Sequence, residues 1–251
     1  MKAIGIMLLR DADRLRYPWR QALASFAPLD GVVIVGDAME QGTPTEGAGA
    51  ATWTYCDWRR YTGPSLCRML VKRGIQVAVL KGATHVLGLD CDEAMHPVDV
   101  AVLRAAAPDV AFLPRWTFWR TIDQVRLVWT VALPRWAAVD ALLASLDAGD
   151  GDGSALPLAP RATMAQFPQW PIFHYGRVGH PRVVAAQRLA TARMFAPDAD
   201  LDVPPEYDFV PRRFDCWLRG QQQPPVPGSF ASYHGEHPSG IAEWAQTVAR
   251  P

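Results

Sequence analysis

The stretch His85-Val86-Leu87-Gly88-Leu89-Asp90-Cys91-Asp92-Glu93 joins a short apolar run to a cluster of three carboxylates. Such a run is typical of a buried strand. Carboxylates this close together repel one another unless something positive lies beside them, and a hard divalent cation with oxygen ligands is the usual partner. In open α/β sheets, ligands bind beyond the carboxyl ends of the strands, which is where these acids fall. The stretch therefore predicts an α/β sheet with a metal and phosphate site at that edge.

A second interpretation of the same acids is structural. His96 and Pro97 follow closely and open a predicted helix, since proline fits the first helical turn. Acids before a helix can cap it and favour its dipole. Three acids exceed what capping requires, which favours the metal over the cap.

The first half of the chain alternates between strand and helix patterns, which predicts β-α-β units. The predicted strands are residues 3–9, 31–35, 52–56 and 85–89, and the predicted helices are residues 17–26, 63–80 and a helix from 96. The strands are apolar runs that suit burial in a parallel sheet. Gly74 weakens the middle of the second helix and is a point where it could divide.

The second half is richer in tryptophan and proline and gives a mixed pattern. Its predicted elements are a strand from 110, antiparallel strands within 115–133, helices over 136–146 and 240–248, and an exposed loop at 147–154. That loop lacks the closing glutamate of a calcium-binding loop. We expect a catalytic domain over residues 1–195 and a loop-rich C-terminal extension over 196–251 that packs on it.

The composition excludes several classes of protein. The chain has 25 basic and 25 acidic residues, and this zero net charge argues against a dedicated nucleic-acid-binding module. No apolar stretch approaches the roughly 20 residues that a membrane helix needs, and the N-terminal run lacks a cleavage site. The four cysteines form no C-x-x-C pair, so we expect reduced thiols and a cytoplasmic protein.

The segment from Val86 to His96 resembles the strand and D-x-D-E motif of the family 2-like glycosyltransferases of GT-A fold. In that family the motif holds a divalent metal against the diphosphate of a nucleotide sugar. The resemblance implies that Asp92 and Asp90 hold Mn2+ or Mg2+, with Asp90 also close to the donor nucleotide. It further implies a Rossmann-like, mixed and mainly parallel sheet flanked by helices.

A second segment, residues 32–43, resembles the same family's strand followed by D-D-G-S-x-D-G-T. Asp37 matches one of the acids, whereas Gly36 stands where the family has the acid before it. The resemblance implies Asp37 as a donor contact, with a plain turn aspartate as the alternative. Arg10, after the first predicted strand, matches the arginine of the family's R-N-E-like segment and is implied in donor binding.

A third segment, Ile172-Phe173-His174-Tyr175-Gly176-Arg177, resembles the I-x-H-Y-G-x-x-R segment of some members, with its arginine placed earlier. A neutral imidazole can complete a divalent site that carboxylates begin, so His174 is implied as a metal ligand. A structural histidine is the alternative. Arg177 is implied as a phosphate clamp.

The resemblance thus implies a metal-dependent and inverting glycosyltransferase that moves a sugar from a nucleotide-sugar donor to an acceptor hydroxyl. Its metal would neutralise charge on the leaving diphosphate, while a base accepts the hydroxyl proton. Glu93 or an acid of the second half is the candidate base. The alternative roles of Glu93 are to support the metal ligands or to orient the acceptor. One alternative is a non-catalytic nucleotide-sugar or divalent-ion binding protein of the same fold. Another is a transferase that modifies DNA or another polymer, and the sequence does not decide among a glycan, a small molecule, a protein and a nucleic acid as acceptor.

Overall fold

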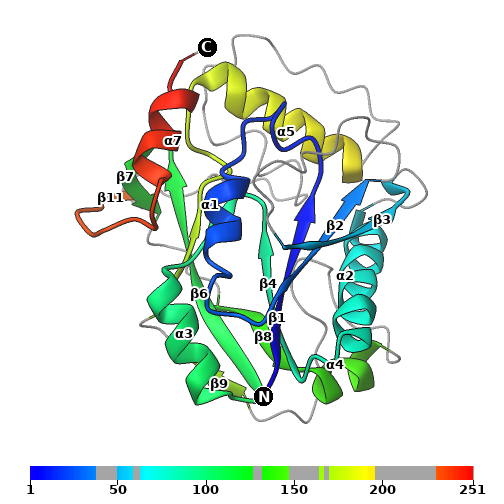
Figure 1. Cartoon of the computed structure of the whole chain (residues 1–251). Helices are drawn as coiled ribbons and strands as arrows, with labels where there is room; N and C mark the ends of the chain where they lie inside the picture. The colour runs from blue at the N-terminus through cyan, green and yellow to red at the C-terminus, as the bar shows by residue number, and fades with distance from the viewer. Residues whose placement is uncertain are drawn as a thin grey trace.

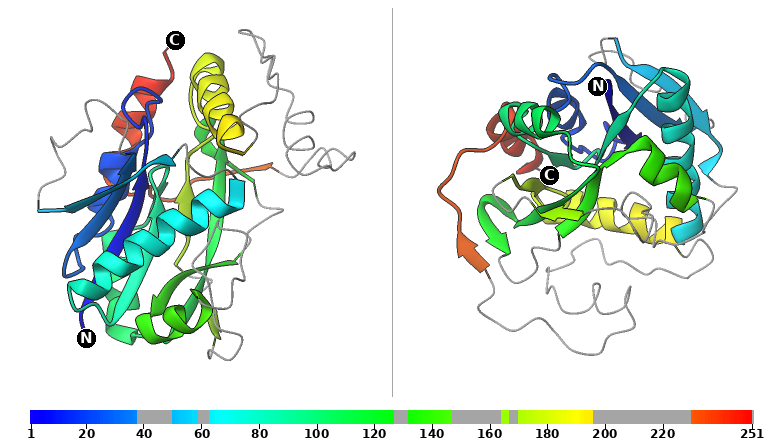
Figure 2. Two further views of the ribbon diagram at one scale, coloured as in Figure 1. Left: turned by 90° about the vertical axis from the view of Figure 1, so that its right-hand side faces the viewer. Right: turned by 90° about the horizontal axis from the view of Figure 1, so that it is seen from below.

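A central mixed sheet with helices on both faces forms the body of the protein in the computed structural model (Figures 1 and 2). The structure describes residues 1–37, 50–58, 63–126, 132–146, 164–166, 170–195 and 230–250. The predicted loop at 147–154 and residues 196–229 of the predicted extension lie outside these ranges. The division of the chain at residue 195 therefore stays a prediction.

Four parallel strands form one half of the sheet, in the spatial order β3-β2-β1-β4. They are β1 (Ala3–Leu9), β2 (Val32–Asp37), β3 (Thr52–Cys56) and β4 (His85–Asp90). All four were predicted from their apolar runs, which suit strands covered on both faces. Because they run parallel, their carboxyl ends lie at one edge of the sheet.

Helices cover both faces of this sheet and its carboxyl edge. They are α1 (Trp19–Ala24), α2 (Gly63–Leu80), α3 (Pro97–Ala106), α4 (Val139–Leu146), α5 (Pro181–Phe195) and α7 (Ile241–Val248). Residues of α1 and α3 join one core cluster, and residues of α2 and α4 join the cluster on the other face. The helix α5 lies at the carboxyl edge (Figure 1).

The helix α2 runs without a break through Gly74. A Cβ atom at Gly74 would lie 2.5 Å from the Cγ2 atom of Ile6, on β1. The glycine therefore allows the helix to approach the sheet closely, and it does not divide the helix as the sequence suggested.

The other half of the sheet is mostly antiparallel. Its strands are β5 (Glu93–Ala94), β6 (Val110–Trp119), β7 (Thr121–Arg126), β8 (Ala132–Ala138), β9 (Met164–Gln166), β10 (Ile172–His174) and β11 (Phe230–Ser232). The strand β8 runs antiparallel between β4 and β6, and β7 runs antiparallel to β6, as predicted. Both β9 and β10 run parallel to β6.

One predicted helix boundary is wrong. The helix expected from Trp136 begins at Val139. Trp136 and the two alanines after it belong to β8, where Trp136 lies opposite Leu87 of β4 and is fully buried. Sheet pairing and burial thus override the helical periodicity of these residues.

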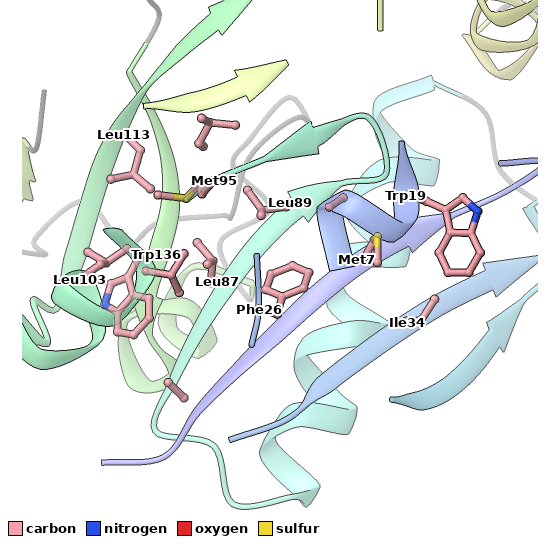
Figure 3. Packing of buried hydrophobic residues seen from close by; sticks show 14 of the residues in the cluster. Met7, Trp19, Phe26, Ile34, Leu87, Leu89, Met95, Leu103, Leu113 and Trp136 are labelled. Carbon is pink, nitrogen blue, oxygen red and sulfur yellow. The ribbon is translucent and has the colours of Figure 1, made fainter. Parts of the chain in front are cut away.

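Buried side chains from both halves form one continuous core on the α1 and α3 face, including Trp19, Phe26, Leu89 and Trp136 (Figure 3). The C-terminal segment also packs back on the body, since the Trp244 indole N–H donates to the carbonyl of Arg16 at 2.9 Å. No helix in the described ranges is long and apolar enough to cross a membrane. The architecture confirms the predicted α/β class, a mixed Rossmann-like sheet of the GT-A type flanked by helices.

Candidate functional site

The carboxyl edge of β1 and β2 brings together two predicted donor contacts. Arg10 follows β1 directly and Asp37 ends β2, and the two strands pair with Leu9 opposite Gly36. The Nε atom of Arg10 lies 3.4 Å from Oδ2 of Asp37. Asp37 is buried, so the strand register holds a guanidinium and a buried carboxylate in contact at this edge.

Trp58 joins this pair and was not identified from the sequence. Its backbone N–H donates to Oδ1 of Asp37 at 3.4 Å, and the guanidinium carbon of Arg10 lies 5.8 Å from its ring centre. The indole Nε1 of Trp58 is buried without a hydrogen-bond partner. The sequence did hold a signal for Trp58. It follows the predicted strand β3, and the carboxyl ends of the parallel strands β2 and β3 lie at the same edge.

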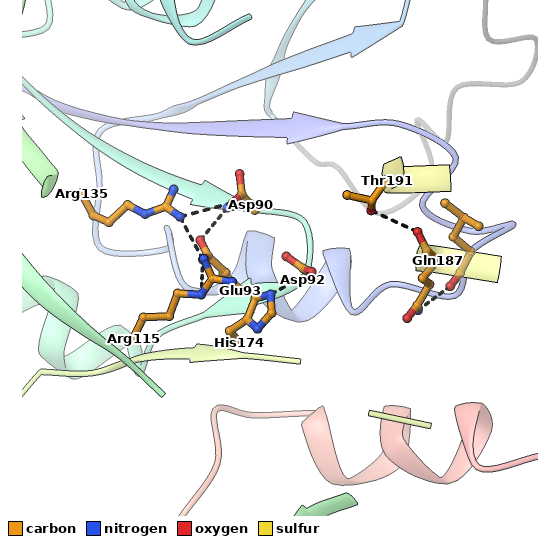
Figure 4. Close-up of polar contacts among 9 residues, drawn as sticks. Asp90, Asp92, Glu93, Arg115, Arg135, His174, Gln187 and Thr191 are labelled. Atoms are coloured by element: carbon orange, nitrogen blue, oxygen red, sulfur yellow. Dashed lines mark hydrogen bonds and ion pairs between the residues drawn. The ribbon is translucent and has the colours of Figure 1, made fainter. Parts of the chain in front are cut away.

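Asp92 and His174 meet beyond the end of β4, although the sequence separates them widely. The short strand β5 pairs with β10 so that Glu93 lies opposite His174, and the backbone N–H of Tyr175 donates to the carbonyl of Asp92 at 2.8 Å. This pairing leaves Nε2 of His174 only 3.3 Å from Oδ2 of Asp92 (Figure 4). Two of the predicted metal ligands are therefore adjacent.

Electrostatics give these two groups complementary protonation states. Burial raises the pKa of Asp92, but His174 and then Arg115 outweigh it and bring the pKa down to about 2. Burial, followed by the charge of Arg115, lowers the pKa of His174. At neutral pH an ionised carboxylate thus faces a neutral imidazole. Cys91 adds no thiolate, since burial raises the pKa of its thiol well above the usual value.

Gly176 provides the space that the Asp92 side chain occupies. A Cβ atom at Gly176 would lie 2.2 Å from Oδ2 of Asp92 and 3.1 Å from Nε2 of His174. Real Cβ atoms do not approach other atoms that closely, so any larger residue would displace the carboxylate. The glycine of the H-Y-G segment is thus a steric requirement of the site.

Glu93, the predicted base, faces the protein interior. It has no exposed surface, and its Oε2 accepts the backbone N–H of Asp90 at 3.0 Å. Its Oε1 lies 2.9 Å from Nη2 of Arg135 and 3.4 Å from Nε of Arg115. Burial raises the pKa of Glu93, and the guanidinium of Arg135 opposes that rise. This geometry favours a positioning role over the predicted role as base.

The two arginines that hold Glu93 lie in a repeated tetrapeptide. The sequence Leu-Pro-Arg-Trp occurs at residues 113–116 and again at 133–136, and the two copies lie on the paired strands β6 and β8. Arg135 also reaches Asp90, with Nη2 3.2 Å from Oδ2. The repeat was a detectable signal for both arginines, but only the strand pairing shows that they meet the same carboxylate.

The side chain of Arg135 lies where the backbone pairing between β4 and β8 ends. Pairing between β4 and β8 ends at Leu87 and Trp136. Arg135, which precedes Trp136 in β8, has 4% of its surface exposed and bonds to Asp90 and Glu93. Beyond the last paired residues, the buried guanidinium of Arg135 connects β8 to Asp90 and Glu93 by side-chain hydrogen bonds.

The predicted metal ligands are only partly gathered. Over the described ranges, no three His, Cys, Asp or Glu side chains are grouped closely enough to hold a metal ion. Asp92 and His174 form the close pair, while Asp90 bonds to Arg135. The residues present fit a divalent cation as two of its ligands, because an ionised carboxylate and a neutral imidazole are accepted ligand types and Gly176 leaves room for them.

The helix α5 fixes the loop that follows β1. The amide of Gln187 donates to the carbonyl of Leu15 at 2.7 Å, and the hydroxyl of Thr191 donates to the carbonyl of Gln187 at 3.0 Å (Figure 4). The side chain of Tyr17 hydrogen-bonds Thr191, and burial and then the charge of Asp92 raise the pKa of Tyr17. Tyr17 thus keeps a neutral hydroxyl on the loop that follows β1. Sequence reasoning did not single it out because it treated Tyr17 as a helix residue.

The last predicted contact, Arg177, packs its guanidinium carbon 5.2 Å from the ring centre of Trp119, and its carbonyl accepts the backbone N–H of Arg120 at 2.8 Å. Its role as a phosphate clamp stays a prediction. The neighbouring Tyr175 is buried and its hydroxyl contacts Nδ1 of His237 at 2.9 Å. The C-terminal segment therefore supports the strand that carries His174.

Comparisons with known proteins give a distant likeness. No family model matches the chain, and no curated protein matches it. Three solved structures that resemble it are residues 1–349 of Staphylococcus aureus TarS with UDP, a 4-diphosphocytidyl-2C-methyl-D-erythritol synthase from Anaerococcus prevotii, and a nucleotide-diphospho-sugar transferase from Desulfovibrio desulfuricans.

The TarS structure has a TM-score of 0.45 at 14% identity over 80% of this chain and 67% of its own. The synthase has a TM-score of 0.43 at 11% identity over 66% and 88%, and the third structure 0.43 at 14% over 70% and 84%. These neighbours are nucleotide-sugar and nucleotidyl transferases with GT-A-like folds, the type that the sequence resembles. With TM-scores below 0.5, the likeness assigns neither a family nor an activity to this chain.

Proposed function

We propose that the chain is a glycosyltransferase that takes its sugar from a nucleotide-sugar donor and uses a divalent cation, Mn2+ or Mg2+. The observation that carries the proposal is the 3.3 Å contact between Oδ2 of Asp92 and Nε2 of His174. They meet across the space left by Gly176, at the edge where Arg10 and Asp37 also lie. Metal ligands and donor contacts thus come from separate segments to one edge.

Each part of the edge suits one part of the donor. Arg10, with Asp37 and Trp58 behind it, would present a cation to a nucleoside at this edge. Asp92 and His174 would hold the cation, which neutralises charge on the leaving diphosphate. We further propose that the sugar is displaced in one step with inversion, which requires a base on the acceptor side.

The experiment measures nucleoside diphosphate released from a panel of UDP, GDP, ADP and CDP sugars, with and without Mn2+. We expect slow, Mn2+-dependent release from one donor class, and Asp92→Asn should lower that rate by about 100-fold or more because it removes a charged ligand. Asp140→Asn, an exposed acid on α4, is the matched control and should release at the wild-type rate. Equal rates in both variants would refute the assignment of Asp92.

A second candidate function is a nucleotide-sugar binding protein of the same fold without turnover. One observation favours it: Glu93, the acid predicted as base, is fully buried and bonded to Arg135. Such a protein would be stabilised by a donor with Mn2+ but would release no nucleotide, even with a mixture of acceptor hydroxyls. Release of nucleoside diphosphate from any donor at a rate above that of Asp92→Asn would exclude a binding protein without turnover.

A further inference from the structure

The three carboxylates at the end of β4, Asp90, Asp92 and Glu93, are not equivalent. Asp90 and Glu93 both bond to Nη2 of Arg135, at 3.2 and 2.9 Å. Asp92 instead faces the ring of His174 at 3.3 Å. Arg135 therefore compensates two acids of the cluster, the buried Glu93 and the 40% exposed Asp90, and Asp92 is left for a ligand.

Arg135 holds its two acids from a fixed position. It has 4% of its surface exposed, it belongs to β8, and its strand neighbour Trp136 is fully buried. Removing a guanidinium from water is costly unless carboxylates surround it, which is the role that Glu93 and Asp90 fill here. Arg135 and Glu93 cannot separate without leaving a buried charge on each of them.

We propose that Arg135 is an internal counter-cation that withdraws Asp90 and Glu93 from the cation site, so that the protein supplies only Asp92 and His174 as ligands. The remaining ligands would then be phosphate oxygens and water, which Mn2+ and Mg2+ accept readily. This inference rests on the proposed function for the identity of the site. It predicts that the cation alone binds weakly and is taken up together with the nucleotide.

The test uses Mn2+ alone as the probe, without any nucleotide, and follows the electron paramagnetic resonance signal of free Mn2+ during titration of the full chain. Arg135→Met removes the guanidinium that bonds to Asp90, whose side chain is 40% exposed, and so frees this carboxylate for the site. We expect the variant to bind Mn2+ at least about ten-fold more tightly than wild type, since affinity rises with the number of charged ligands. Arg135→Lys keeps a positive charge and should stay within about three-fold of wild type. Asp90→Asn combined with Arg135→Met should lose most of the gain.

Thermal unfolding gives a second readout in the same samples. Mn2+ should raise the melting temperature of Arg135→Met more than that of wild type, because a ligand stabilises the state that binds it. If Arg135→Met does not fold, Asp90→Asn in the wild-type background decides: we expect unchanged Mn2+ affinity, within about two-fold, whereas Asp92→Asn loses binding. A folded Arg135→Met with no gain, or a loss in Asp90→Asn as large as in Asp92→Asn, would overturn the proposal.

These outcomes separate this inference from the proposed function. A gain of Mn2+ affinity in Arg135→Met supports the inference even when no nucleotide sugar is turned over. Donor turnover that depends on Asp92, together with an unchanged Mn2+ affinity in Arg135→Met, would refute the inference and leave the transferase proposal standing.

Discussion

The acid cluster at the end of β4 has two halves that differ in what balances their charge. Glu93 and Asp90 face the guanidinium of Arg135, and the side chain of Glu93 has no exposed surface while that of Asp90 keeps 40% of its surface exposed. Asp92 faces the ring of His174, and its side chain keeps 18% of its surface exposed. Adjacent acids in the sequence therefore do not form one site, because Arg135 balances the charge of Asp90 and Glu93 and leaves Asp92 for a ligand.

The largest effect should come from removing Arg135, the counter-charge of Glu93 and Asp90. Arg135→Ala leaves Glu93 buried without its nearest counter-charge, so we expect the free energy of unfolding to fall by about 3–5 kcal/mol in urea denaturation followed by circular dichroism. Arg14→Ala removes the exposed pair with Asp11 and serves as the control, with a change below about 1 kcal/mol. Equal losses in the two variants would remove the distinction between the halves.

The ligand half should respond in activity more than in stability. His174→Gln removes the imidazole that faces Asp92, and we expect the Mn2+ concentration for half-maximal donor hydrolysis to rise by about 10–100-fold. The control is His234→Gln, an exposed histidine of the C-terminal segment, which should leave that concentration unchanged. An equal rise of this Mn2+ concentration in both variants would show that His174 is not part of the cation site.

A smaller effect tests the space in this half. Gly176→Ala would place a Cβ atom 2.2 Å from Oδ2 of Asp92, so the carboxylate must move. We expect about a ten-fold loss in donor hydrolysis, because small displacements of a positioned group are costly. Gly31→Ala is the matched control, since nothing lies within 4 Å of its Cβ position. Full activity of Gly176→Ala would show that the position of Asp92 is not critical.

The smallest effect concerns the segment that supports His174 from behind. Burial lowers the pKa of His237, a partner of Tyr175, so the folded state favours the neutral form of this histidine. Its contribution is present above the unfolded pKa near 6.5 and is lost as the pH falls through that value toward the folded pKa. We expect melting temperatures measured from pH 7.5 to 5.0 to fall less in His237→Gln than in wild type.

The same pH series carries its own check. Burial also lowers the pKa of His85, at the opposite end of the sheet, so wild type and His237→Gln should both keep a residual fall from this group. A fall in His237→Gln as steep as in wild type would show that His237 contributes nothing to the pH dependence of stability.

Much of the fold follows from the sequence because its information is local. The apolar runs of β1 to β4 define buried strands, and the position of Asp90 and Asp92 at the carboxyl end of β4 then indicates the edge that carries the candidate site. Trp136 shows the limit, since its helical periodicity gives way to pairing with Leu87, a contact that no local pattern records.

The candidate site was predictable only in part for the same reason. The motifs identify Asp92 and His174 separately, and the structure brings them within 3.3 Å. Arg135 lies 42 residues from Glu93 in the chain, so nothing near either residue reveals the contact. The counter-charge of an acid cluster is a tertiary property, and it decides which of the acids can bind a ligand.

The most direct test of a donor and cation site at Asp92 is thermal unfolding of wild type and Asp92→Asn with each nucleotide sugar, in the presence and absence of Mn2+. We expect a rise in melting temperature for one donor class that requires Mn2+ in wild type and is absent from Asp92→Asn. An equal rise in both proteins, or no rise with any donor in folded wild type, would contradict a donor and cation site at Asp92.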